Sequence, residues 1–477
     1  MEILTDAAKR SPRNEVARFI LSDLDKAATL MDGKDFQTTR INRDVALLLK
    51  SRVALFEATW LKYFKGSAFV PNGEDWPGKT KEYNANYQYP SGNIDNEINW
   101  FLEEAMTASK EVAEKYKSSL TKNTGIVKQD LATTENPYFA MFGQEDLSGV
   151  KEVLMWRQYV QGLGSGHDVA LAADEGNWGV GVTRGFVQNF LMADGLPVYA
   201  HGTYADGDGY YMGDKTIADV RTNRDSRLTV FLKEPGQKNV LIESVSGLTN
   251  IWLDEPYPKI TDGAVQYAYT TGYALRKGGA WDSKYLVQNK CFLGIPIYRA
   301  LVSDNIDATI AATDLNKEAE NDWGAYSAGK ILTDKTLYNI RRERRCEYIS
   351  EGLRWMDLCR WRAMDQMTVT PYLPEGMHLW NTPMERWYDD SKGNTTLVYG
   401  TDKANVSSPN DSEYLLPYRK TANQLAYEGF VWKMAHYLDP IRIDQFQITS
   451  TDGKNIETSP IYQNPYWPTT ADMAAEK

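Results

Sequence analysis

The sequence predicts a mainly α-helical protein, a scaffold of tetratricopeptide-like helical hairpins with a long, irregular, loop-rich face and only minor β structure. Residues 15–31, 42–64 and 98–116 each place apolar side chains at spacings of three and four, which gives each segment one apolar helix face. Helical periodicity returns strongly at residues 334–362. The segments between these stretches are dense in glycine, asparagine, proline and aromatic residues, a composition that favours loops.

The first two helical segments have recognisable start signals. Ser11 and Pro12 precede residues 15–31, and Asn42 is a good N-cap for the segment that follows it. Two such helices in succession form a hairpin, and stacked hairpins bury a continuous core. We therefore predict that the tryptophans within helical segments pack in the core, namely Trp60, Trp355 and Trp361.

The chain is expected to form one compact unit with two regions, residues 1–135 and residues 136–477. The first region holds the paired helices and a loop at residues 66–96, and a loop of that length is more often functional than idle. Residues 136–284 lose the helical period and become glycine-rich, apart from a helix predicted near residues 184–193. Short apolar runs in this part favour strands, at residues 153–156 and 228–232.

Composition excludes several classes of protein. Lys and Arg number 53 against 64 Asp and Glu, a net charge of −11, so a nucleic acid is a poor general partner. The three cysteines are too few for a disulfide framework, and they leave the redox compartment undetermined. No window approaches twenty apolar residues and the first residues lack the pattern of an export signal, which predicts a soluble chain.

We find no residues that indicate catalysis, a cofactor or a metal. The four histidines are dispersed, and the sequence has no phosphate-binding glycine-rich loop before a helix and no nucleophile elbow. The acidic residues do not lie in a recognisable glycosidase context. Residues 206–214 resemble a calcium loop at two positions only, because Tyr210 and Tyr211 stand where a ligand and a glycine belong.

Aromatic residues make up 12% of the chain, and many of them lie among glycine, asparagine and aspartate. Exposed loop rings of this kind suit sugar binding, because the apolar face of a pyranose lies on a flat ring while polar groups bind its hydroxyls. The alternative is that these rings only hold the loops in place. From local composition, the predicted ligand-binding rings are Trp76, Tyr83, Tyr87, Trp178 and Trp281.

The densest charge cluster follows residue 340 and is interpreted as a structural ion network rather than a nucleic-acid site. Arg344 and Glu347 are three residues apart, as are Glu351 and Arg354, so opposite charges can pair along one helix face. Bidentate contacts between arginine and carboxylate groups would then hold helices together.

Four parts of the sequence together resemble the SusD/RagB family of surface glycan-binding lipoproteins from Bacteroidetes. The most specific is the arginine-rich helix at residues 340–361. The others are the helix pair at residues 15–31 and 42–64, residues 186–197 followed by 224–227, and the ending at residues 437–441 with 463–465.

The resemblance implies a SusD-like α superhelix without catalytic residues. It implies capture of oligosaccharides at the extracellular face of the outer membrane and their delivery to a TonB-dependent, SusC-like transporter. The lipid anchor of such proteins follows a signal peptide that this chain does not contain, and relatives have a longer segment before the first helix pair, so the start is expected to be truncated. Around residues 299–305 a family helix is expected to be missing. The RagB branch makes a peptide ligand the alternative, since the loop rings favour sugar while the acidic net charge would suit basic peptides.

Overall fold

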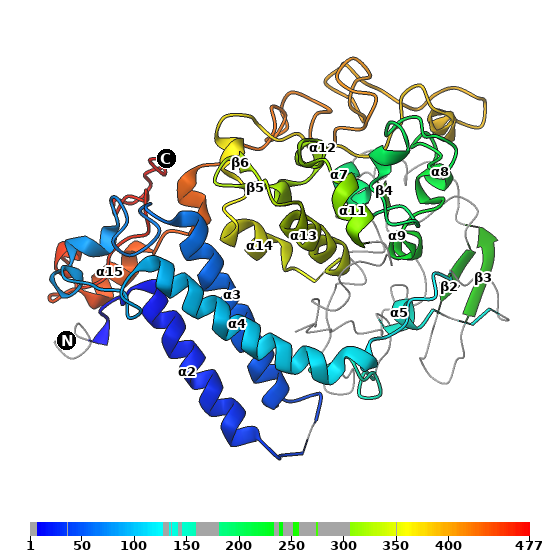
Figure 1. Cartoon of the computed structure of the whole chain (residues 1–477). Helices are drawn as coiled ribbons and strands as arrows, with labels where there is room; N and C mark the ends of the chain where they lie inside the picture. Colours follow the sequence, from blue (N-terminus) through cyan, green and yellow to red (C-terminus); the bar gives the residue numbers. More distant parts are fainter. Residues whose placement is uncertain are drawn as a thin grey trace.

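The computed structural model in Figure 1 shows a mainly helical protein with minor β structure, as predicted. The structure describes residues 7–35, 37–126, 133–134, 136–141, 146–158, 181–232, 238–241, 251–256, 273–274, 306–349 and 351–477. Within these ranges, none of the helices combines the length and the apolar character needed to cross a membrane.

Three long helices form the N-terminal part of the scaffold, namely α2 (Arg13–Met31), α3 (Arg43–Phe64) and α4 (Ile94–Tyr116). They run beside one another, and α3 contacts both of the others (Figure 1). These helices confirm the predicted hairpin and the third helix, because the apolar spacing gives each one a face to bury.

Side-chain caps fix where two of the long helices begin. The side-chain oxygen of Asn42 accepts a hydrogen bond from the Val45 N–H at 3.1 Å, and Asn93 does the same for the Asn96 N–H at 2.9 Å. Each cap satisfies a backbone donor that the first turn of a helix leaves without a partner. The Asn42 amide also donates to the Leu154 carbonyl at 3.0 Å, which ties the start of α3 to a later segment.

The rest of the described chain consists of short elements joined by long irregular segments. The α-helices are α5 (Pro137–Ala140), α7 (Arg184–Asn189), α8 (Ile217–Arg221), α9 (Ser226–Phe231), α11 (Ile306–Ala312), α12 (Leu315–Asn321), α13 (Lys335–Glu347), α14 (Arg354–Arg360) and α15 (Ile443–Thr449). The strands form three antiparallel pairs, β1 (Gly181–Val182) with β4 (Tyr273–Ala274), β2 (Lys238–Leu241) with β3 (Ile251–Pro256), and β5 (Tyr326–Ser327) with β6 (Lys330–Ile331). The 3₁₀ turns are η1 (Pro77–Thr80), η2 (Glu82–Asn84), η3 (Lys117–Ser119), η6 (Val198–His201), η9 (Trp323–Ala325), η10 (Asp365–Thr368), η11 (Pro383–Tyr388), η12 (Met434–Tyr437) and η13 (Ile456–Thr458).

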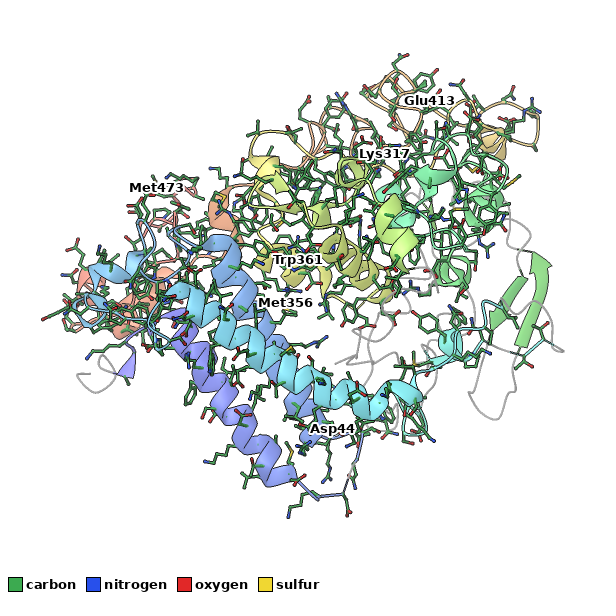
Figure 2. The ribbon with its side chains drawn as sticks, in the orientation of Figure 1. Asp44, Lys317, Met356, Trp361, Glu413 and Met473 are labelled. Atoms are coloured by element: carbon green, nitrogen blue, oxygen red, sulfur yellow. The ribbon has the colours of Figure 1, made fainter. Side chains whose placement is uncertain are left out.

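The main core lies where α14 packs against the long helices. Met356 of α14 and Trp361, the residue directly after that helix, lie at this junction (Figure 2), and Trp361 is buried beside the equally buried Trp60 and Phe64 of α3. The rings of Trp60 and Phe64 stack 4.2 Å apart. The core therefore joins the first and last thirds of the chain, while the division at residue 135 stays a prediction.

The structure corrects three details of the predicted elements. The helix predicted at residues 334–362 is two helices, α13 and α14, and the link between them contains Gly352 with φ 71°, a conformation that favours glycine. Residues 228–231 lie in helix α9, which ends just before Leu232, and the run at 153–156 is irregular, so both strand predictions are wrong. Four or five apolar residues alone do not distinguish a strand from a buried helical turn. The helix predicted near residue 184 is confirmed as α7.

Candidate functional site

A cavity of about 780 Å³ opens at the start of α2, within the size range of small-ligand sites. Its walls come from α2, the middle of α3, the segment after α3, and the C-terminal segment near residue 464. The apolar lining includes Val16, Ala17, Ile20, Leu49, Val53, Phe56, Phe69, Trp76, Met356 and Leu438. The charged and amide lining consists of Lys9, Arg10, Arg13, Arg52, Glu57 and Asn464.

One wall of the cavity is aromatic. The Trp76 ring lies 6.1 Å from the Tyr462 ring and 6.0 Å from the Tyr87 ring, at steep angles to both. The chain turns tightly past this indole at η1, where a Cβ atom on Gly78 would come within 2.3 Å of the Trp76 ring. A side chain at position 78 would therefore displace the Trp76 ring, so glycine allows the loop to pass close to it.

Two arginines of the lining have different partners. The Arg13 guanidinium donates to both carboxylate oxygens of Glu57, at 3.0 and 2.8 Å, and lies 4.1 Å from the Trp60 ring centre. The Arg10 guanidinium donates to neutral oxygens instead, the Tyr462 carbonyl at 2.9 Å and the Asn464 side-chain oxygen at 2.6 Å. Burial lowers the pKa of Arg10 from its ordinary value.

The structure brings three of the predicted ligand-binding rings into this neighbourhood. Trp76, 6% exposed, lines the cavity, whereas Tyr87, 9% exposed, lies behind it in the core and donates to the Asn14 side-chain oxygen at 2.8 Å. Tyr83 is 38% exposed, and its hydroxyl donates to the Pro460 carbonyl at 2.6 Å. Much of the aromatic content of this loop thus packs the loop onto the core. Ligand contact stays a prediction for all five rings, and Trp178 and Trp281 lie outside the described residues.

Sequence reasoning missed the polar residues of the cavity. Arg10 and Asn464 are 454 residues apart, and no local pattern connects them. A proline lies close to each of these two residues, at positions 12 and 465. Proline restricts the local backbone, but it does not indicate a ligand site.

A second pocket of about 370 Å³ adjoins the cavity. The cavity and the second pocket are both lined by Arg52, Phe56 and Met356, so they share a wall formed by α3 and α14. The second pocket is mostly apolar, and its charged residues are engaged in the fold, since Arg344 binds Asp357 at 2.9 Å.

The three helical tryptophans differ in burial. Trp60 is 1% exposed and Trp361 is buried, as predicted, but Trp355 is 55% exposed, so its assignment to packing is wrong. Helix α14 turns Asp357, Leu358 and Cys359 inward, and this leaves Trp355, the second residue of the helix, on the outer side. The Trp355 ring keeps only an edge contact with the buried Trp432, at 5.6 Å.

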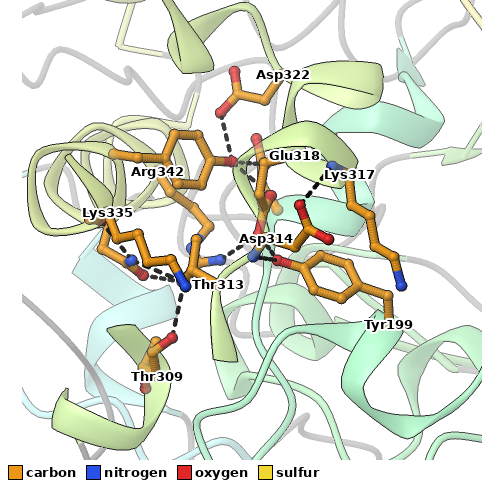
Figure 3. A network of polar contacts seen from close by, with 12 residues as sticks. Tyr199, Thr309, Thr313, Asp314, Lys317, Glu318, Asp322, Lys335 and Arg342 are labelled. Carbon is orange, nitrogen blue, oxygen red and sulfur yellow. Dashed lines mark hydrogen bonds and ion pairs between the residues drawn. The ribbon is translucent and has the colours of Figure 1, made fainter. Parts of the chain in front are cut away.

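The arginine-rich helix takes part in a buried polar network, part of which Figure 3 shows. Glu318 accepts hydrogen bonds from Tyr338 at 2.6 Å, Arg342 at 2.8 Å and Tyr199 at 2.8 Å. Asp322 lies beside this group and accepts from the Tyr338 hydroxyl at 3.2 Å.

Three of the four charged residues that the sequence singled out, Arg344, Glu347 and Arg354, bind residues of other elements. Arg344 of α13 pairs with Asp357 of α14, and Arg354 of α14 pairs with Asp322. Glu347 accepts from Arg227 at 3.0 Å. These contacts fasten α13, α14 and α9 together, while the pairing between residues three apart and the role of Glu351 stay predictions.

The geometry described so far defines a helical-hairpin scaffold with a ligand-sized cavity at the start of α2. Within the described residues, no cluster of three or more histidine, cysteine or acidic side chains is arranged to hold a metal ion. Residues 299–467 match the model of the SusD family. Over that part of the chain, the match supports the resemblance to the SusD/RagB family that the sequence indicated.

A solved structure of a SusD superfamily protein from Bacteroides fragilis NCTC 9343 is similar to this chain at 16% sequence identity and a TM-score of 0.34. The match covers 76% of this chain and 64% of that protein, so this chain spans less than two thirds of its length. No curated protein matches the chain.

Proposed function

We propose that this protein is a non-catalytic binding component that captures oligosaccharides at the cell surface and passes them to a TonB-dependent, SusC-like transporter. The observation that carries the proposal is the SusD family match over residues 299–467, because that family consists of nutrient-binding proteins of the outer membrane. A lipid anchor would hold the protein at the extracellular face of that membrane.

The cavity is the site where we propose that the ligand binds. It combines the aromatic wall around Trp76 and Tyr462 with hydrogen-bonding groups on Arg10 and Asn464. Carbohydrate recognition uses these two kinds of surface together, with rings against the apolar sugar face and polar groups against its hydroxyls.

A peptide ligand is the second candidate, and one observation favours it. Four basic residues and a single acid line the cavity, next to apolar side chains such as Val16 and Ile20. Such a lining would suit a peptide that presents a carboxylate and an apolar side chain.

Isothermal titration calorimetry against plant, fungal and host oligosaccharides, with a mixed peptide pool alongside, tests both candidates. Val16→Trp would fill the cavity from α2, whereas Phe19→Trp alters the exposed face of the same helix outside the lining. Saturable glycan binding that Val16→Trp removes and Phe19→Trp preserves would support glycan capture in the cavity.

Other outcomes would contradict parts of the proposal. Binding to peptides alone would exclude the glycan assignment, and new reducing ends after incubation with a glycan would exclude a purely binding role. Glycan binding that survives Val16→Trp and is lost in Trp178→Ala would move the site to the predicted ring at position 178.

A further inference from the structure

Arg10 is a partly buried cation whose partners are uncharged. Its two side-chain hydrogen bonds go to the Tyr462 carbonyl and the Asn464 side chain, and its guanidinium lies 4.6 Å from the Tyr462 ring centre. No described carboxylate forms an ion pair with it, whereas Arg13, the first residue of α2, is neutralised by Glu57. Arginine has five N–H donors, so the two bonds leave further donors for a ligand.

The lining around Arg10 is basic although the protein is acidic. Lys9, Arg10, Arg13 and Arg52 line the cavity against one carboxylate, that of Glu57, while the whole chain has a net charge of −11. The basic character is therefore local to the cavity. In a cavity with basic residues and partly apolar walls, the electrostatic field of the positive charges is focused, which raises the local concentration of anions.

Removing a cation from water is unfavourable unless an opposite charge compensates for it. Carbonyl and amide oxygens compensate Arg10 only in part, and a carboxylate would do so fully through shorter, charge-assisted hydrogen bonds. An anionic group that enters the cavity would therefore bind more tightly to Arg10 than to a guanidinium that is already paired with a carboxylate.

We propose that the cavity selects acidic oligosaccharides, with the carboxylate of a uronic acid residue bound by the Arg10 guanidinium. This inference rests on the proposed function, because it names the class of glycan that the same site takes. The competing explanation is that Arg10 only fastens the C-terminal segment to the start of α2.

The test compares two ligands with the same sugar backbone, trigalacturonate and its methyl ester, in which methyl groups replace the negative charges of the carboxylates. Calorimetry on the wild-type protein should show that the acid binds about 10- to 100-fold more tightly than the ester, the range expected for hydrogen bonds to a charged group. Raising the salt concentration should weaken binding of the acid and leave binding of the ester nearly unchanged.

Two variants separate ligand binding from a structural role. Arg10→Gln keeps a hydrogen-bond donor and removes the charge, so it should lower the affinity for the acid to that for the ester while leaving the ester itself unaffected. Arg10→Lys keeps the charge and should retain most of the preference. A structural role alone would weaken binding of both ligands together, and thermal melting of each variant shows whether it folds.

The outcomes distinguish this inference from the proposed function. Equal affinity for acid and ester, or a preference for the acid that survives in Arg10→Gln, would overturn the inference and leave neutral glycan capture standing. If Arg10→Gln does not fold, the ligand pair and the salt series on the wild-type protein still decide. Binding of peptides with a free carboxyl terminus, but not of amidated peptides or any glycan, would overturn both proposals.

Discussion

Asp322 is the residue whose replacement should damage the scaffold most clearly. Its side chain is fully buried and accepts hydrogen bonds from the Gly324 N–H at 2.8 Å and the Tyr338 hydroxyl at 3.2 Å. It also neutralises Arg354 and lies 3.3 Å from an Arg345 nitrogen. Asp322→Asn keeps the size of the side chain and removes its charge, which leaves two arginines without their carboxylate.

Breaking a buried ion pair by removing one partner costs about 3–5 kcal/mol, so we expect Asp322→Asn to lower the free energy of unfolding by that amount at pH 7. Burial alone would raise the pKa of the Asp322 carboxyl, but Arg354 and Arg345 more than offset this and hold the pKa below its ordinary value. Since the folded-state pKa lies below the unfolded-state value of about 3.9, the ionised group stabilises the fold above that pH. This stabilisation is lost as the pH falls through the folded-state pKa.

Urea unfolding followed by tryptophan fluorescence from pH 7 to pH 3 measures both effects. The difference between wild type and Asp322→Asn should be largest at pH 7 and should shrink below about pH 4. The control is Asp95→Asn, which removes an exposed partner of Lys65 and should cost at most about 1 kcal/mol. A cost at Asp322 no larger than at Asp95, or a deficit that stays constant down to pH 3, would refute this reasoning.

Three further predictions follow from burial and capping. Trp60→Ala should cost about 3–5 kcal/mol in urea unfolding, because it empties a filled core position, and a loss below about 1 kcal/mol would contradict that packing. Asn42→Ala should cost at least about 1 kcal/mol, measured the same way, because it removes the α3 cap and the hydrogen bond to the Leu154 carbonyl, and unchanged stability would contradict both roles. Burial raises the pKa of the Cys346 thiol above its ordinary value and raises the pKa of the Cys359 thiol to about 12. In a Cys291→Ser variant, neither thiol should therefore react with a thiol reagent at pH 8 before the protein unfolds. Fast reaction of the native protein would contradict the burial of these two residues.

The sequence predicted the long helices well and the cavity poorly, for a physical reason. Apolar spacing over about twenty residues identifies α2 and α3, because a face of that length must be buried. Helix α14 has only seven residues, too few for spacing to tell which side faces the core, and Trp355 was misplaced for that reason. The ring of Trp76 is flanked by polar residues as an exposed loop ring would be, yet its loop folds back onto the core.

The contacts between the two ends of the chain determine when the cavity forms during synthesis. Tyr83 binds the Pro460 carbonyl, 377 residues later, and Arg10 binds Asn464. At roughly 5–20 residues per second, a ribosome takes about 20–75 s to make the chain between Tyr83 and its partner. Helices α2, α3 and α4 can pair early because their contacts are local in the sequence. The aromatic wall of the cavity is therefore among the last parts to assemble, and a nascent chain released before residue 460 would have its helical hairpins but no closed cavity.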